Sequence, residues 1–386
     1  MEKKIEGEAK LTFFEATSII VGHGVGSGIL SVPYLASRNS WASILIVIAV
    51  VYCINLLMHY MIAELSYNNN GAQFVKCFEN ELFTGKAKKI FTWIAFGLLG
   101  LSVLVNVAGF IAGAAAVFKS WFGLPTYLGM VLYYLLAAAV VNFGMKLVGI
   151  CEKISVGSMI IVMVILFAAT MIADKTGFAN HFYAASNVVA LYSMVAFSLS
   201  AVMSVPQVVK GLQGDTKKIR RSIAAGTGIN VGLILVITFI TLLASGAEVS
   251  EDGALVDLAG HLGGWVAIVG YIFSLLALST SFWANTLNLR DIIHEQTNWN
   301  IRLSWLVSTL PCLLLALVGL QSFVGFTRLA SVIQVVTGIG IIVSYNRSRK
   351  REGTSPICGR FGTLIFQILV VASSVAATVG ALFPVK

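Results

Sequence analysis

Residues 21–28 read VGHGVGSG, with glycine at every second position inside an otherwise apolar stretch. Each glycine in a helix interior costs about 1 kcal/mol relative to alanine, so the run disfavours a continuous helix. Within a membrane, an unwound backbone is tolerated only where it is buried in protein or lines a watery cavity. The stretch therefore predicts a discontinuous helix near the middle of a membrane. Close packing of helices against small residues is the alternative interpretation.

The composition supports a membrane environment for this stretch. Of the 386 residues, 58% are hydrophobic and 11% are charged, and the mean hydropathy is +0.88. A soluble domain carries about 25% charged residues. Apolar runs of about 20 residues, enough to cross a bilayer, predict an all-α integral membrane protein with eleven transmembrane helices. Their ranges are 11–36, 42–64, 90–118, 126–145, 150–173, 185–210, 222–245, 265–293, 303–320, 326–345 and 361–383.

The basic residues predict the orientation of these helices. If the N-terminus is cytoplasmic, 21 of the 26 Lys and Arg residues fall on the cytoplasmic side. Arg38, Lys119, Lys175, Arg328 and Lys386 are left on the other side. With an odd number of helices, the C-terminus is then extracytoplasmic, and we expect a multi-pass protein of the plasma membrane. Because this topology explains the net charge of +9, we expect no nucleic-acid partner.

A short motif occurs twice, as SGILSVP at 27–33 and as SAVMSVP at 200–206. Coincidence is an alternative in a chain rich in serine and valine. However, the same offset also superposes other predicted helices, and the two copies lie on helices that cross in opposite directions. Inverted repeats of this kind are typical of secondary transporters. We therefore predict a single transporter domain over 1–386, with repeats at 11–173 and 185–345 and an additional helix at 361–383.

Two stretches carry a family resemblance. GSGILSVPYLASRNSW at 26–41 resembles the first-helix signature of the amino acid/auxin permease family. AFSLSAVMSVPQVVKGLQGDTKKIRRSI at 196–223 is similar to that family's sixth helix and the basic loop after it. The family belongs to the amino acid-polyamine-organocation superfamily, so the resemblance implies the leucine-transporter fold. That fold is a 5+5 inverted repeat with discontinuous helices one and six.

The predicted breaks suggest a substrate site. A helix that restarts in the membrane directs free amides and a positive dipole end at an anion such as a carboxylate. Helix six has no glycine between Ala184 and Gly211, unlike the family pattern, so its unwinding is expected somewhere within 196–201. The candidate substrate-binding residues are Gly26, Ser27, Gly28, Asn106, Phe197, Ser198, Ser200 and Trp283. Ordinary core packing is the alternative for each aromatic residue.

The resemblance also implies a cation site between helices one and eight. Sodium-coupled members of this fold place two helix-one carbonyls against a helix-eight carbonyl that is followed by two hydroxyls. The matching residues are Gly22, Val25, Ala277, Thr280 and Ser281. An unwound backbone supplies such carbonyls to a coupling ion. Hydroxyls in membrane helices usually bond back to their own backbone, which is the alternative role for the last two residues.

His23 is a competing candidate, as a proton site. Ionisable residues within spans are expensive and therefore functional candidates, and the ordinary pKa of histidine suits a proton relay. A neutral histidine bonded to a carbonyl is the alternative. A proton-coupled relative uses a lysine in helix five. Residues 154–173 contain no ionisable residue, which favours Na⁺.

Other ionisable residues of the spans are expected to be structural. Glu64, Glu152 and Asp291 lie at predicted cytoplasmic helix ends, where we expect salt bridges of a gate or loop. We expect no functional role for His59.

These observations predict a secondary active transporter of neutral amino acids, aromatic or branched ones included, that works by alternating access with Na⁺. One alternative is an H⁺-coupled permease that uses His23, and another is a non-transporting amino acid receptor or sensor on the same fold. No HExxH, GxSxG or phosphate-loop motif occurs, so we do not expect an enzyme. The expected partners are the amino acid and the lipid bilayer, in a monomer or weak homo-oligomer. No cofactor is expected beyond the coupling ion.

Overall fold

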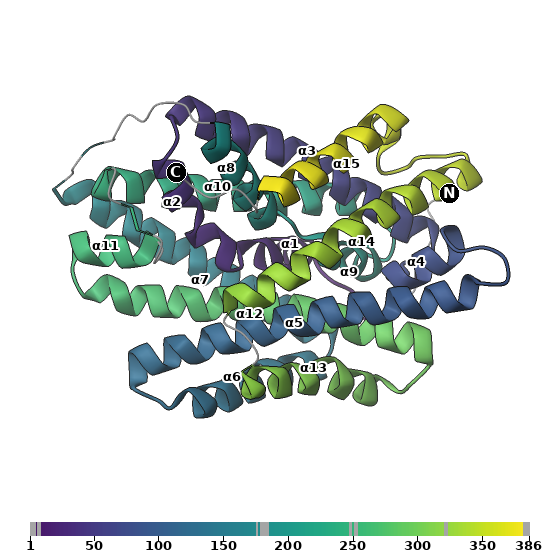
Figure 1. Cartoon of the computed structure of the whole chain (residues 1–386), viewed down its shortest axis with the longest axis horizontal. Coiled ribbons are helices and arrows are strands. Elements are labelled where there is room, and N and C mark those ends of the chain that lie inside the picture. Colours follow the sequence, from purple (N-terminus) through teal and green to yellow (C-terminus); the bar gives the residue numbers. More distant parts are fainter. Residues whose placement is uncertain are drawn as a thin grey trace.

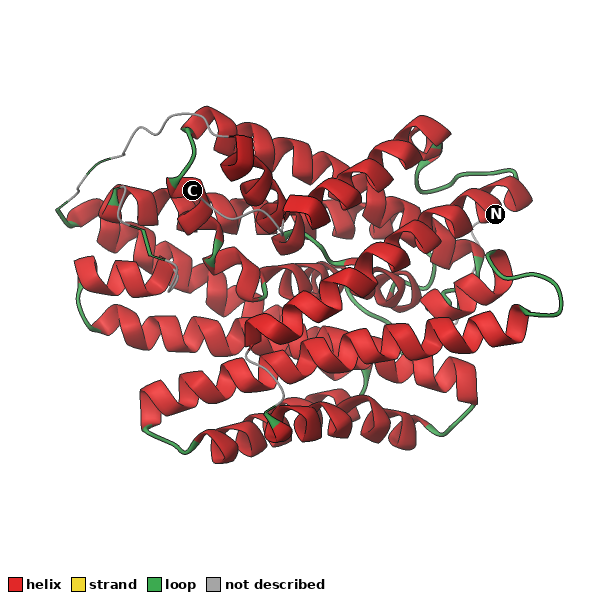
Figure 2. Ribbon diagram, in the orientation of Figure 1, coloured by secondary structure: helices red, strands yellow, loops and turns green. Residues whose placement is uncertain are grey.

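A computed structural model shows an all-helical chain (Figure 1). It describes residues 5, 9–174, 177, 185–246, 249–250, 254–319 and 323–380, with side chains for these apart from Ser27 and residues 323–336. Figure 2 shows only helices and loops over these ranges. In chain order the elements are α1 (Phe13–Val25), η1 (Ser27–Leu30), α2 (Val32–Ser37), α3 (Trp41–Asn68), α4 (Phe74–Glu81), α5 (Lys88–Phe122), α6 (Thr126–Asn142), α7 (Met145–Ile172), α8 (Ala185–Ser198), η2 (Val202–Ser204), α9 (Val205–Gly211), α10 (Thr216–Ser245), α11 (Ala254–Leu262), α12 (Trp265–Thr297), α13 (Ile301–Val318), α14 (Phe323–Glu352), η3 (Gly359–Gly362) and α15 (Leu364–Gly380).

Every predicted membrane segment contains a helix in the described part of the chain. Within the described ranges, seven spans are long and apolar enough to cross a membrane, and a helix pair bent by 55°, Phe13–Val25 with Gly28–Ser37, would be an eighth. The apolar helices α6 and α15 are shorter, and α14 covers the last remaining segment. The predicted connection at 246–264 also contains a helix, α11, which its acidic and glycine-rich composition did not indicate.

Polar capping residues explain where two of the spans begin. Thr12 starts α1 with a capping box, because its hydroxyl accepts the Glu15 amide while the Glu15 carboxylate accepts the Thr12 amide. Asp215 caps α10 by accepting the Lys218 amide. Hydropathy does not detect such polar turns, so α10 begins six residues before its predicted start at 222.

Two spans are discontinuous, as predicted. The first consists of α1, η1 and α2, and the sixth of α8, η2 and α9, with the sixth interrupted directly after Ser198. Both copies of the repeated motif adopt the same local structure. Ser31 and Ser204 each precede a helix with proline in its first turn, and their φ and ψ angles are −91° and −16°, and −87° and −15°. Proline is favoured there because the first amides of a helix have no intrahelical acceptor. The residue boundaries of the two repeats stay a prediction.

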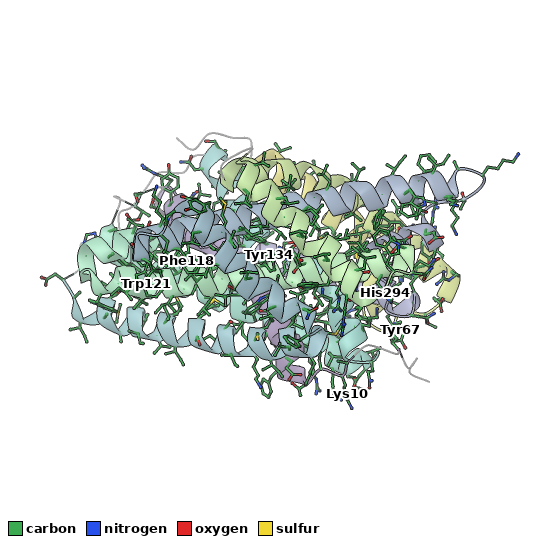
Figure 3. The ribbon with its side chains drawn as sticks, turned by 90° about the horizontal axis from the view of Figure 1, so that it is seen from below. Lys10, Tyr67, Phe118, Trp121, Tyr134 and His294 are labelled. Atoms are coloured by element: carbon green, nitrogen blue, oxygen red, sulfur yellow. The ribbon has the colours of Figure 1, made fainter. Side chains whose placement is uncertain are left out.

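The long helices run side by side in one bundle (Figure 1). The first span is at its centre, where α1 packs against α7, α10 and α12, while α6 and α13 lie together beside α5 at one edge. Figure 3 places Lys10, Tyr67 and His294 at one end of the bundle and Trp121 at the other. Lys10 precedes the first span, Tyr67 and His294 lie near the C-terminal ends of the second and eighth spans, and Trp121 lies near that of the third. The first three spans therefore cross in alternate directions. Which end faces the cytoplasm stays a prediction.

The bundle has an apolar outer surface and polar residues inside. Leu136, Ile161 and Val164 are each more than 60% exposed, as lipid-facing side chains would be. Glu64 and Glu152, in contrast, are completely buried. Because a buried acid is costly without partners, these two residues show where the interior of the bundle needs hydrogen bonds or a counter-charge.

Candidate functional site

The glycines of α1 allow side chains from neighbouring helices to approach its backbone closely. A Cβ on Gly22 would overlap the Glu152 carboxyl of α7 and come within 2.8 Å of the Thr280 Cβ of α12. A Cβ on Gly24 would overlap the Asn230 side-chain amide of α10. These two glycines therefore serve close contact between helices, which was the alternative interpretation of the glycine run.

The backbone break itself is confined to Gly26. The helix α1 continues through Gly22 and Gly24 and ends at Val25, and Gly26 has φ 15° and ψ −164° before η1 begins at Ser27. Gly22 and Gly24 each destabilise the helix by about 1 kcal/mol relative to alanine. Packing of α1 on three neighbouring helices can offset this loss. Both features that the sequence suggested, a break and close packing, are thus present at different glycines.

The structure brings three of the five predicted cation residues into direct contact. Thr280 Oγ1 donates to the carbonyl of Gly22 at 2.9 Å and to that of Ala277 at 3.0 Å, so it joins α12 to α1. The Ser281 hydroxyl is buried and has no hydrogen-bond partner among the described residues. Val25 is buried one turn after Gly22. Gly22, Ala277 and Thr280 therefore form one cluster, and Ser281 Oγ lies beside Gly26, the residue after Val25. The binding of Na⁺ by the five predicted residues stays a prediction.

Glu152 belongs to the same cluster, and the expectation that it forms a gate or loop salt bridge is wrong. It is 0% exposed, and neither carboxyl oxygen has a hydrogen-bond partner in the described part of the chain. Because α7 begins at Met145 and not near 150, Glu152 lies about two turns inside the helix. Lys146, directly after the predicted end of the preceding span at 145, hid the start of the helix from a hydropathy profile.

Glu64 and Asp291 form different kinds of contact. Asp291 pairs with Arg290, its neighbour on α12, at 2.8 Å, so this salt bridge lies within one helix and is not the expected contact of a gate or loop. Glu64 instead accepts hydrogen bonds from Ser355 Oγ at 2.7 Å and from the Ile357 amide at 2.9 Å. Its carboxylate therefore anchors the connection between α14 and α15 by hydrogen bonds.

Two further ion pairs join spans at the end of the bundle that carries the N-terminal segment. Glu15 on α1 pairs with Lys146 on α7 at 2.7 Å. Lys210 on α9 pairs with Glu295 on α12 at 3.2 Å. Each pair connects one of the discontinuous spans to a continuous helix.

Both histidines of the first two spans contact the sixth span near its break. His23 Nδ1 lies 2.9 Å from the Ser204 hydroxyl. His59 Nε2 accepts the Ala201 amide at 3.0 Å, which satisfies a donor that the interrupted helix leaves free. Sequence reasoning missed this role of His59. The signal was an ionisable residue within an apolar span.

The second part of the candidate site lies where the two breaks meet. A Cβ on Gly28 would come within 2.6 Å of Ser198 Oγ and 2.8 Å of Phe197 Cδ1, so the end of α8 packs directly on η1. The Phe197 ring remains 40% exposed. Ser198 Oγ donates to Met194 O at 2.8 Å, and the Ser200 amide donates to Phe197 O at 3.1 Å. An aromatic ring therefore lies beside the backbone at which the first span restarts.

The remaining predicted substrate residues have less specific positions. Asn106 is buried on α5 with 8% exposure. Trp283 donates its indole N–H to Ala137 O on α6 at 3.1 Å, a contact that fits the core-packing alternative. The side chain of Ser27 lies outside the described residues. The substrate contacts of these three residues stay predictions.

The comparison with protein families assigns a family to this chain. A model of the tryptophan/tyrosine permease family matches residues 10–378. The chain belongs to the tryptophan/tyrosine permease family. The match specifies this family and not the amino acid/auxin permease family that the two quoted stretches resemble. No curated protein matches the permease significantly.

Two solved structures share the fold of the permease. MhsT in complex with L-phenylalanine has a TM-score of 0.68 and 14% identity, covering 98% of the permease and 100% of MhsT. Mhp1, a nucleobase-cation-symport-1 family transporter in a closed conformation with bromovinylhydantoin bound, has a TM-score of 0.64 and 14% identity. That match covers 100% of the permease and 96% of Mhp1. The leucine-transporter-like fold class is confirmed, and the permease is a multi-pass membrane transport protein and not an enzyme.

Proposed function

We propose that the permease is a secondary active transporter of aromatic amino acids in the plasma membrane. The observation that carries this proposal is the meeting of the two broken spans, with Phe197 and Ser198 packed against Gly28. Broken helices place polar backbone groups at membrane depth, where transporters bind their substrates. The family description and the phenylalanine bound to MhsT support an aromatic side chain among the neutral amino acids.

The proposed binding mode follows from the two breaks. The substrate carboxylate would bind the amides around Gly26, Ser27 and Gly28, at the start of η1. The substrate amine would meet carbonyls near Phe197 and Ser198, where α8 ends. The Phe197 ring would cover an aromatic substrate, since aromatic pairs attract beyond the area they bury.

Alternating access would come from rocking one group of spans against the rest. The moving group would be α1 with α2, α3, α8 with α9, and α10. The ion pairs Glu15–Lys146 and Lys210–Glu295 both join this group to α7 or α12, so they would separate when that end opens. With the N-terminus in the cytoplasm, this is the cytoplasmic end. We expect a monomer or a weak homo-oligomer.

The coupling ion in this proposal is Na⁺, bound by the cluster of Gly22, Val25, Ala277, Thr280 and Ser281. Carbonyl and hydroxyl oxygens are suitable ligands for a hard cation. The buried, unpartnered Ser281 hydroxyl supports the fit of these residues to an ion.

Uptake into proteoliposomes tests transport and its coupling. We expect radiolabelled tryptophan, tyrosine or phenylalanine to accumulate under an inward Na⁺ gradient, and accumulation to be lost in a Thr280→Ala, Ser281→Ala double variant. Thr286→Ala is the matched control, because the Thr286 hydroxyl is also buried on α12 but bonds to Phe282 O of its own helix. It should keep wild-type uptake.

A proton gradient distinguishes the second candidate, which the His23–Ser204 contact favours. Uptake driven only by inward H⁺, and lost in His23→Ala, would move coupling to this histidine. Tight amino acid binding without flux under either gradient would contradict transport and indicate a receptor.

Gly28→Ala should weaken binding of aromatic amino acids by about tenfold, or about 1.4 kcal/mol. The added methyl group would come within 2.8 Å of the Phe197 ring and displace it from the junction of the two breaks. Equilibrium binding of radiolabelled tryptophan to the purified permease measures the effect. Gly232→Ala on α10 has no atom within 4 Å of its new methyl group and is the control. Unchanged affinity in Gly28→Ala would show that the substrate does not depend on this junction.

A further inference from the structure

The Glu152 carboxyl occupies a specific place between three helices. It lies against α1 at the position a Gly22 side chain would fill, beside the Thr280 Cβ of α12. Both of its oxygens are buried and lack hydrogen-bond partners among the described residues. The Ser281 hydroxyl of α12, which lies beside Gly26 about one turn further along the first span, is also buried without a partner among the described residues. The two Glu152 oxygens, the Ser281 hydroxyl and the Gly22 carbonyl are four oxygen atoms on three helices. They indicate a ligand that prefers to be bound by oxygen atoms.

The ion pairs that the structure shows on the helices around Glu152 join other residues. Among the described residues, no ion pair includes Glu152. On α1, Glu15 pairs with Lys146 of α7, and on α12, Arg290 pairs with Asp291. The basic residues of α10 are all in its first two turns, and α6 carries no charged residue. Burying an ionised carboxylate without a counter-charge costs far more than a hydrogen bond returns.

A cation would satisfy this group. Na⁺ prefers oxygen ligands, and the carbonyl and hydroxyl groups of the predicted cation cluster are all neutral. A carboxylate in contact with them would supply the single negative charge that balances a monovalent cation in a low dielectric. Gly22 permits this arrangement, because any larger residue would exclude the carboxyl.

We propose that the Glu152 carboxylate is a ligand of the coupling cation, together with oxygens of Gly22, Thr280 and Ser281. This inference rests on the proposed cation-coupled function and adds an acidic ligand from a third helix. The site would then take a monovalent metal cation between α1, α7 and α12, with its charge compensated by the protein.

Binding of ²²Na⁺ to the purified full-length permease tests the inference without transport. Glu152→Gln keeps the size of the side chain and removes its charge, so we expect the Na⁺ affinity to fall by about tenfold or more. Glu79→Gln, on the partly exposed surface of α4, should leave it unchanged. Wild-type affinity in Glu152→Gln, or no Na⁺ binding by the wild type, would overturn the proposal.

Two further measurements keep the result interpretable. The thermal stability of wild type should rise with added Na⁺, and this rise should be smaller in Glu152→Gln. An equal rise in both proteins would also overturn the inference. If Glu152→Gln does not fold, Glu152→Ala provides the same loss of charge. Exchange of external for internal labelled tryptophan, which tests transport itself, separates failure of this cation site from failure of the proposed function.

Discussion

Gly22→Ala is expected to remove Na⁺-dependent uptake and to lower Na⁺ affinity by at least about tenfold, or about 1.4 kcal/mol. The new methyl group would overlap the Glu152 carboxyl and come within 2.8 Å of the Thr280 Cβ. The carboxyl can rotate away, but the Thr280 Cβ is fixed to the backbone of α12. The helices must therefore separate, which adds an overpacking cost of about 1–3 kcal/mol. Uptake, ²²Na⁺ binding and thermal unfolding measure the three consequences.

Gly157→Ala is the matched control for this change. Gly157 lies on α7, as Glu152 does, and no atom lies within 4 Å of a methyl group placed there. Alanine is a better helix former than glycine, so Gly157→Ala should keep or slightly raise stability and leave uptake unchanged. Normal Na⁺-driven uptake by Gly22→Ala would contradict the close contact of α1, α7 and α12 as the basis of cation binding.

Glu64→Ala is expected to destabilise the permease by at least about 3 kcal/mol, because several buried donors would lose their acceptor at about 1–3 kcal/mol each. The Glu64 carboxylate accepts Tyr345 Oη at 3.0 Å, Ser355 Oγ at 2.7 Å, and the amides of Ile357 and Cys358 at 2.9 and 2.8 Å. It is completely buried, so water does not replace it. Thermal unfolding in detergent should show a lower Tm, and limited proteolysis should cleave the connection between α14 and α15 more readily.

Two variants test whether the hydrogen bonds accepted by the Glu64 carboxylate account for the expected loss of stability. Glu64→Gln should be nearly as damaging, because its amide group would present donors to donors. Glu79→Ala removes only a partly exposed ion pair with Lys76 and should change stability by at most about 1 kcal/mol. A Glu64→Ala protein as stable as Glu79→Ala would show that the connection is held by other contacts.

The prediction of the site from sequence succeeded where local pattern was sufficient. The glycine run and the repeated S-x-x-x-S-V-P motif predicted both interrupted spans, because glycine cost and proline position act within a few residues. The spacing of Gly22, Ala277 and Thr280 predicted a contact that the Thr280 hydroxyl makes. The assignment failed for Glu152, since an acid near an apparent helix end looks identical whether it faces water or a neighbouring helix.

The sequence by itself determined that this chain is a helical membrane protein, approximately where its spans lie, and which two are broken. These properties depend on the composition of about 20 consecutive residues and on residues that restrict or release the backbone locally. Only the tertiary structure decided that Glu152 reaches Gly22, that His59 binds the Ala201 amide, and that Phe197 lies on Gly28. Such contacts depend on how each helix is rotated and how closely it crosses its neighbours. Small residues and packing across the whole bundle set those quantities.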